Sequence, residues 1–79
     1  QVKLRGYRIE PGEIEAVLRA STGVRAAGVA VAGEGDRARL VAGVVGEAGG
    51  AVDVTALRDR LRVALPVAMV PADIVALPA

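Results

Sequence analysis

Cysteine, histidine, phenylalanine and tryptophan are all missing from this chain of 79 residues. Without cysteine the chain cannot form a disulfide, a thiolate nucleophile or a cysteine-ligated metal site, and thiol-free sequences fit the reducing cytoplasm. Without histidine it lacks the commonest general base and the commonest metal ligand, which excludes Ser-His-Asp triads and histidine-ligated zinc sites. Tyr7 is the only aromatic residue and Met69 the only methionine, so the core must be aliphatic.

The chain also has little net charge and no long apolar segment. Its formal net charge is +1, too weak for the clustered basic surface that binding to nucleic acid requires. No apolar run approaches the roughly 20 residues of a membrane span, and no secretory signal begins the chain. We therefore expect no nucleic-acid partner, no membrane partner and a cytoplasmic location. The length suits one small domain, and a start at Gln1 suggests a piece of a larger protein.

The first quarter of the sequence predicts an extended segment followed by a helix. Gln1–Ile9 alternates between apolar and charged side chains, which is typical of a strand or a hairpin, and Gly6 interrupts the alternation as a bend would. Pro11 suits the first position of a helix, where its missing N–H costs nothing. Apolar residues then recur at helical spacing, so we predict a helix over Pro11–Ser21.

Two strands joined by a short turn are predicted in the middle of the chain. Val24–Ala32 and Arg39–Gly46 are rich in valine and alanine, and the segment Gly33–Asp36 between them is typical of a turn. The short connection favours antiparallel pairing. The second of these strands is apolar on both faces, which favours a central strand that is covered on each side.

A second helix and a final strand are predicted after a glycine-rich loop. Asp53 is a suitable N-cap for a helix over Val54–Leu65, and Pro66 would end it. Asp73–Leu77 could form a last short strand. The order is then β-α-β-β-α-β, which predicts a small two-layer α+β domain. Its short mixed or antiparallel sheet would have about three main strands, with an N-terminal hairpin and two packed helices.

Few residues of the chain could carry chemistry. The two glutamates at positions 13 and 15 are two apart on the predicted helix and do not share a face, so we interpret them as structural. Gly33-Glu34-Gly35 is too short and too acidic to cradle a phosphate. We interpret the arginines of the second helix as a solvated face: these are Arg58, Arg60 and Arg62.

The basic residues around Gly6 allow two interpretations. Lys3, Arg5 and Arg8 surround a glycine that would let a ligand approach the backbone closely, and lysine and arginine both bind phosphate groups. A phosphate or a phosphopantetheine group could therefore bind here. The alternative is an ordinary solvated strand face, and the pattern alone favours that alternative.

Two segments of the chain resemble core motifs of nonribosomal peptide synthetase adenylation domains. QVKLRGYRIEPGEIEAVL, from Gln1 to Leu18, resembles the eighth core motif, and LPVAMVPADIVAL, from Leu65 to Leu77, resembles the ninth. Between them, GVRAAGVAVAG and RARLVAGVV look like the two middle strands of that family. The resemblance implies the C-terminal subdomain of an adenylate-forming, AMP-binding enzyme over residues 1–79.

The resemblance also implies a two-step ligase reaction. Such enzymes use ATP and Mg to convert an amino acid to an aminoacyl adenylate, and then transfer the acyl group to the phosphopantetheine thiol of a peptidyl carrier domain. The implied partners are therefore the large N-terminal adenylation subdomain and the carrier domain. The small subdomain rotates between the two half-reactions. It presents a catalytic lysine in the first and the loop of the eighth motif in the second.

Individual residues can be matched to these roles by position in the motifs. Lys3, Arg5, Gly6 and Tyr7 are matched to the thiolation loop that contacts pantetheine, and Arg8 and Glu10 to its support. The family's catalytic lysine would lie beyond Ala79, so we expect no catalytic or metal-binding residue in this chain, no cofactor bound by it alone, and no activity in isolation.

Departures from the family pattern and two alternatives remain. Ala68 stands where the ninth motif usually has tyrosine, and Pro11 where the eighth usually has leucine.

One alternative is the same subdomain of an acyl-CoA or aryl-acid ligase, although the form of the eighth motif favours the peptide synthetase type. The other is a stand-alone α+β interaction module, which would have no large ATP-binding domain encoded upstream.

Overall fold

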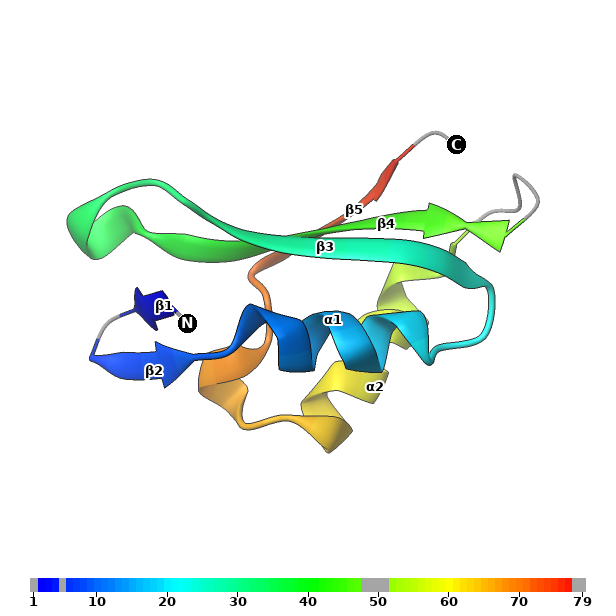
Figure 1. Ribbon diagram of the computed structural model, residues 1–79, viewed down its shortest axis with the longest axis horizontal. Coiled ribbons are helices and arrows are strands. Elements are labelled where there is room, and N and C mark those ends of the chain that lie inside the picture. The colour runs from blue at the N-terminus through cyan, green and yellow to red at the C-terminus, as the bar shows by residue number, and fades with distance from the viewer. Residues whose placement is uncertain (1, 5, 48–51, 78–79) are drawn as a thin grey trace.

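The computed structural model describes residues 2–4, 6–47 and 52–77, which fold into two sheets and two α-helices. The predicted α+β class is confirmed, and each predicted strand and helix is present (Figure 1). In chain order the elements are β1 (Val2–Leu4), β2 (Tyr7–Ile9), α1 (Pro11–Arg19), β3 (Val24–Ala32), the 3-10 turn η1 (Gly35–Arg37), β4 (Arg39–Gly46), α2 (Val54–Ala64), the 3-10 turn η3 (Val67–Met69) and β5 (Asp73–Leu77).

Both α-helices begin at the predicted residue and end slightly earlier than predicted. Helix α1 ends at Arg19 and α2 at Ala64. The predicted N-cap of α2 is confirmed, because the Asp53 Oδ1 atom accepts a hydrogen bond of 3.1 Å from the Ala56 backbone N–H. In the described ranges, neither helix has the length and apolar character needed to cross a membrane.

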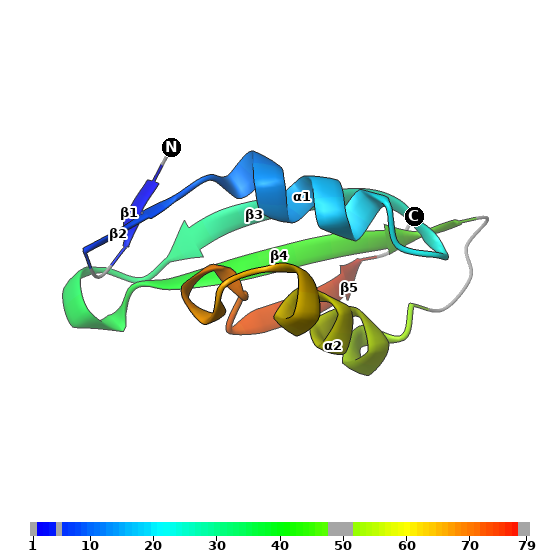
Figure 2. The ribbon, with the colours of Figure 1, turned by 90° about the horizontal axis from the view of Figure 1, so that it is seen from below.

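Among the described residues, helices cover the larger sheet on one face only. Strand β4 lies in its centre, antiparallel to β3 and parallel to β5, and both α-helices lie on the same side of this sheet (Figures 1 and 2). Along β4, Leu40, Ala42 and Val44 are buried, whereas the alternate positions are only partly buried. The prediction that this strand is covered on each side is therefore wrong. Its outer positions are small (Val41, Gly43 and Val45), so they can stay partly exposed without a second layer of helices.

The core is aliphatic, as predicted, and it unites the hairpin, both helices and the larger sheet. Side chains from each of these parts are fully buried together, and burial of one such side chain contributes about 1.5–3 kcal/mol. Because the hairpin supplies a fully buried residue, its position against the helix layer is set by the core. The largest fully buried apolar side chains include Ile9, Ile14, Leu18, Val44 and Leu61.

A carboxylate joins α1 to the edge of the larger sheet. The Glu15 Oε2 atom accepts a hydrogen bond of 2.9 Å from the backbone N–H of Val29. Strand β3 is an edge strand, so this N–H would otherwise have no partner strand. The other oxygen of Glu15 lies 3.8 Å from the guanidinium of Arg19, one helical turn further along α1. Glu15 thus has the structural role predicted for it, through a contact between residues that are far apart in sequence.

Candidate functional site

The hairpin formed by β1 and β2 separates an apolar face from a basic face. The two strands pair Lys3 with Arg8 and Leu4 with Tyr7. Leu4 and Ile9 point into the core, and because side chains alternate along a strand, Lys3 and Arg8 share the opposite, exposed face. The structure therefore brings together two basic residues that are five positions apart in sequence.

The connection between these strands contains Gly6, whose backbone φ is +81°. Residues with a side chain rarely adopt this left-handed conformation, so glycine suits the position. Apart from the two chain neighbours of Gly6, no atom of the described residues would lie within 4 Å of a Cβ placed on it, so the space above this backbone is open. A ligand could approach the main chain closely here. Arg5, the other loop residue matched to the family motif, lies outside the described residues.

An open hollow of about 390 Å³ lies on the basic face of the hairpin, lined by Val2, Lys3, Gly6 and Arg8. Within the described ranges, the Lys3 and Arg8 side chains form no hydrogen bond or ion pair with other protein groups. Like charges directly opposite each other across two strands are destabilising. An anionic group held between them would remove this repulsion and gain two charge-assisted contacts.

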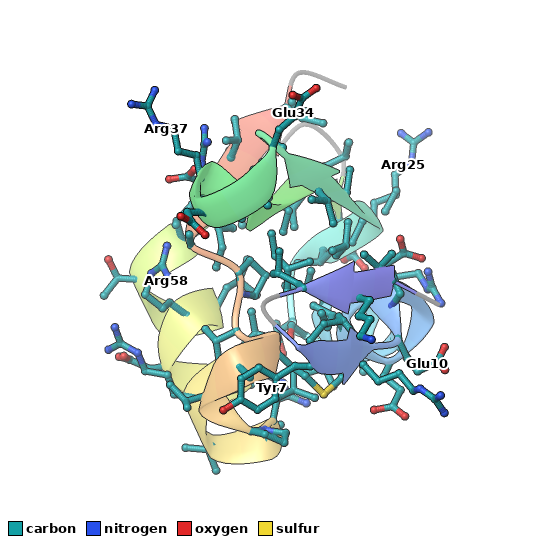
Figure 3. The ribbon with its side chains drawn as sticks, turned by 90° about the vertical axis from the view of Figure 1, so that its left-hand side faces the viewer. Tyr7, Glu10, Arg25, Glu34, Arg37 and Arg58 are labelled. Atoms are coloured by element: carbon teal, nitrogen blue, oxygen red, sulfur yellow. The ribbon has the colours of Figure 1, made fainter. Side chains whose placement is uncertain are left out.

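Tyr7 lies on the other side of the hairpin, next to the connector between α2 and β5 (Figure 3). Its side chain is 60% exposed and borders a second hollow of about 300 Å³. This hollow includes Ala68, at the position where the ninth motif usually has tyrosine. Besides Tyr7 and Ala68, its lining residues are Leu4, Arg39, Leu40, Val67 and Val70.

The two residues matched to loop support occupy different environments. Arg8 is exposed beside Lys3 on the basic face. Glu10 directly precedes α1, and its backbone carbonyl accepts a hydrogen bond of 3.0 Å from the Glu13 N–H, which closes the first helical turn. The Glu10 backbone therefore fixes the junction between the hairpin and the helix.

Sequence reasoning was wrong about Arg58, which it placed on a solvated helix face. The Arg58 guanidinium donates hydrogen bonds to the backbone carbonyls of Pro71 at 2.9 Å and Ala72 at 3.1 Å. It thereby attaches α2 to the segment that leads into β5. No local pattern distinguishes this arginine from its neighbours Arg60 and Arg62, because its acceptors lie 13 and 14 residues further along the chain.

Metal ligands do not gather in the part of the chain that the structure describes. No group of three or more acidic side chains there could hold a metal ion. The hairpin, by contrast, offers open backbone at Gly6 beside two cations, which suits a phosphate-bearing organic group.

Known proteins resemble this chain over nearly its whole length, although no model of a protein family matches it. Phosphinothricin tripeptide synthetase PhsC of Streptomyces viridochromogenes is 55% identical over 73 residues, which are 90% of this chain and 7% of the synthetase. Malpibaldin synthetase of Mortierella alpina is 49% identical over 77 residues, which are 98% of this chain and 1% of that protein.

A solved structure gives the same result in three dimensions. The crystal structure of a four-domain nonribosomal peptide synthetase bound to AMP and glycine superposes with a TM-score of 0.85 at 44% identity, over 98% of this chain and 6% of that one. The chain is a C-terminal subdomain of the nonribosomal peptide synthetase adenylation type. The subdomain spans 7% or less of the length of these three proteins. The resemblance to the eighth core motif covers the hairpin and most of α1, and the resemblance to the ninth covers Leu65–Leu77, from the end of α2 through β5.

Proposed function

We propose that the subdomain is the mobile part of an amino-acid-activating ligase of the peptide-antibiotic type. The parent enzyme would use ATP and Mg to form an aminoacyl adenylate, and would then transfer the acyl group to the phosphopantetheine thiol of a peptidyl carrier domain. The large N-terminal adenylation subdomain and the carrier domain would be its partners. Such an enzyme would work in the cytoplasm, where ATP is supplied. High identity to synthetases over nearly the whole subdomain supports this proposal.

We assign the hairpin to the second half-reaction of the parent enzyme. In thioester formation, the thiol sulfur bonds to the carbonyl carbon of the adenylate, the bond from that carbon to the phosphate oxygen breaks, and AMP leaves while the thiol proton passes to solvent. Gly6 would provide a passage for the arm that carries the thiol, because the space above its backbone is open. That open glycine is the observation on which this role of the hairpin rests.

The cations beside Gly6 would orient the arm. Lys3 and Arg8 lie across from each other without a protein counter-ion in the described ranges, so they are available to a phosphodiester. Both side chains are exposed, so each contact would be modest, on the order of 0.2–1 kcal/mol. We propose the same contact for Arg5. Tyr7 would lie on the opposite side of the hairpin and would contact the arm or the surface beside it.

Two substitutions at Gly6 in the parent enzyme test this assignment. We expect Gly6→Leu to slow thioester formation on the carrier domain at least tenfold while ATP–pyrophosphate exchange stays close to wild type. Gly6→Ala is the matched control. It places a residue with a Cβ in the same left-handed φ, which costs about 1–2 kcal/mol of conformational free energy, but its side chain is much smaller than that of leucine. If a side chain at this position obstructs the passage, Gly6→Leu should slow thioester formation far more than Gly6→Ala does.

Two outcomes would contradict the assignment. If both substitutions reduce both half-reactions equally, the hairpin acts only through folding. If Gly6→Leu loads the carrier domain at the wild-type rate, the arm does not pass this glycine.

A further inference from the structure

Two arginines hold the start of β5, one from each face of the larger sheet. On the helix side, the Arg58 guanidinium donates hydrogen bonds to the backbone carbonyls of Pro71 at 2.9 Å and Ala72 at 3.1 Å (Figure 3). On the outer side, the Arg39 Nε atom donates to the Asp73 Oδ2 atom at 2.9 Å. Side chains alternate along β4, so Arg39 points away from the helix layer. We call these three hydrogen bonds the β5 clamp.

Strand β5 has few other contacts that could fix its direction. It is an edge strand, and in the described ranges it pairs only with β4, in the parallel arrangement that is slightly less stable per residue. Of its five residues only Ile74 is buried, and Val75 and Leu77 are each nearly half exposed. The direction of this strand therefore depends strongly on how its first residues are held.

The β5 clamp fixes an orientation as well as a position. A guanidinium presents its N–H groups in a rigid planar fork, and two of them here bond to carbonyls of adjacent residues. Pro71 is fully buried, and the Ala72 N–H donates to the Leu40 carbonyl at 3.0 Å. Three successive residues, 71 to 73, are thus each held by a hydrogen bond just where the strand begins.

A small change of angle at this point would grow along the strand. At about 3.3 Å per residue, β5 spans roughly 13 Å from its first to its last Cα atom. A tilt of about 10° at the start would therefore move the last residue by roughly 2 Å. Misplacement of a reacting group by about 1 Å can slow a reaction on the order of a hundredfold.

The chain that leaves β5 matters for the first half-reaction. The resemblance places the catalytic lysine of the parent enzyme beyond Ala79, so it would follow this strand. That lysine would have to reach the adenylating site with the accuracy that chemistry requires. The β5 clamp lies upstream of it and is part of the rigid core layer, which suits the clamp to set its position.

We propose that Arg58 is a positioning residue for adenylate formation, and that Arg39 supports it through Asp73. By holding the start of β5, the two arginines would set where the lysine lies, although neither would touch the substrates. This inference rests on the proposed function and assigns to the first half-reaction a part of the subdomain far from Gly6 in sequence. Loss of the clamp should therefore affect the two half-reactions differently.

The test uses the full adenylation domain of the parent enzyme. For Arg58→Ala we expect kcat of ATP–pyrophosphate exchange to fall about tenfold, because the lysine would act in the transition state while the substrates bind elsewhere. The KM values for ATP and the amino acid should stay close to wild type. Thioester formation from added aminoacyl adenylate should also stay close to wild type, since Leu4 and Ile9 anchor the hairpin in the core.

Two further variants grade the effect. Arg58→Lys keeps a cation that can donate to one of the two carbonyls, so it should recover part of the lost kcat. Arg39→Ala removes only the exposed contact with Asp73 and should lower kcat by about two- to threefold. Because Arg39 is exposed, this variant should fold and would test the clamp even if Arg58→Ala did not.

A matched control separates positioning from a general effect of charge on α2. Arg62→Ala removes an arginine from the same helix, where its ion pair with Asp59 is exposed, and should leave the exchange rate unchanged. Circular dichroism melts of each variant would set an assay temperature at which all of them are folded.

Three outcomes would overturn the inference. A folded Arg58→Ala variant with wild-type kcat would show that the clamp serves stability alone. Equal loss in both half-reactions would show that it supports the subdomain as a whole. An Arg62→Ala variant as slow as Arg58→Ala would assign the effect to the charge of the helix. If the wild-type parent forms no adenylate at all, the proposed function itself fails, and this result is distinct from the other three.

Discussion

The hydrogen bond between Glu15 and Val29 predicts a measurable loss of stability on Glu15→Ala. The carboxylate, 26% exposed, accepts the N–H of an edge strand at 2.9 Å. Leaving a buried donor without an acceptor costs about 1–3 kcal/mol, and Val29 is only partly buried, so water would compensate in part. We therefore expect a loss of about 1–2 kcal/mol. That is a substantial part of the roughly 4–12 kcal/mol that a domain of this size has in total.

Urea unfolding followed by circular dichroism measures this loss. With an m-value of about 1 kcal/mol/M for a small domain, the midpoint should fall by roughly 1–2 M. Glu15→Gln keeps an acceptor oxygen, so its free energy of unfolding should fall less than that of Glu15→Ala. Arg19→Ala removes only the ion pair, so its free energy of unfolding should fall by about 0.5 kcal/mol at most.

Amide hydrogen exchange shows whether the named hydrogen bond is the cause. In Glu15→Ala the Val29 amide should lose more protection than those of Gly28 and Ala30, since amides along a strand alternate between its two edges and these two point toward β4. A Glu15→Ala variant as stable as the wild type would refute the reasoning. Equal loss of protection at all three amides would also refute it.

Two further substitutions test contacts that fix the rest of the fold. Arg58→Ala removes both hydrogen bonds to the carbonyls of Pro71 and Ala72, so urea unfolding should show a free energy of unfolding lower by about 1–2 kcal/mol. Arg62→Ala is the control. Its ion pair with Asp59 is exposed, so it should lower the free energy of unfolding by less than about 0.5 kcal/mol. Equal losses in the two arginine variants would contradict the role given to Arg58. Gly33→Ala should lower the melting temperature strongly, because φ is +82° there and the new Cβ would lie 2.6 Å from the Arg37 carbonyl oxygen. If the substitution lowers the free energy of unfolding by about 2 kcal/mol or more, the melting temperature should fall by roughly 8 °C or more. Gly12→Ala is the control: Gly12 lies in α1 with open space around it, so alanine there should not lower the melting temperature.

The sequence predicted most of the elements because their signals are local. Pro11 marks the start of α1 and Asp53 the start of α2, and both act through backbone groups within a few residues of themselves. Strand β5 begins and ends where the sequence placed it, at Asp73 and Leu77. The motif at residues 1–18 likewise needed no structure, because the resemblance lies in the order of the residues.

Local patterns could not determine which surfaces meet. Strand β4 is apolar on both faces, and only the placement of both helices on one side shows which face is buried. The alternation of Gln1–Ile9 was compatible with a strand or a hairpin, and only the pairing of β1 with β2 sets Lys3 beside Arg8. The contact of Arg58 with the start of β5 likewise depends on how α2 lies against the larger sheet.

By itself, the sequence determined the elements, their order and the resemblance to adenylation domains, since each depends on residues that are neighbours along the chain. Only the tertiary structure decided that Glu15 supports the edge of β3, that Arg58 holds the start of β5, and that Arg39 pairs with Asp73 on the neighbouring strand. The physical reason is that each of these features joins residues more than ten positions apart. Their meeting depends on how helices pack on a sheet, and that packing is set by the whole core at once.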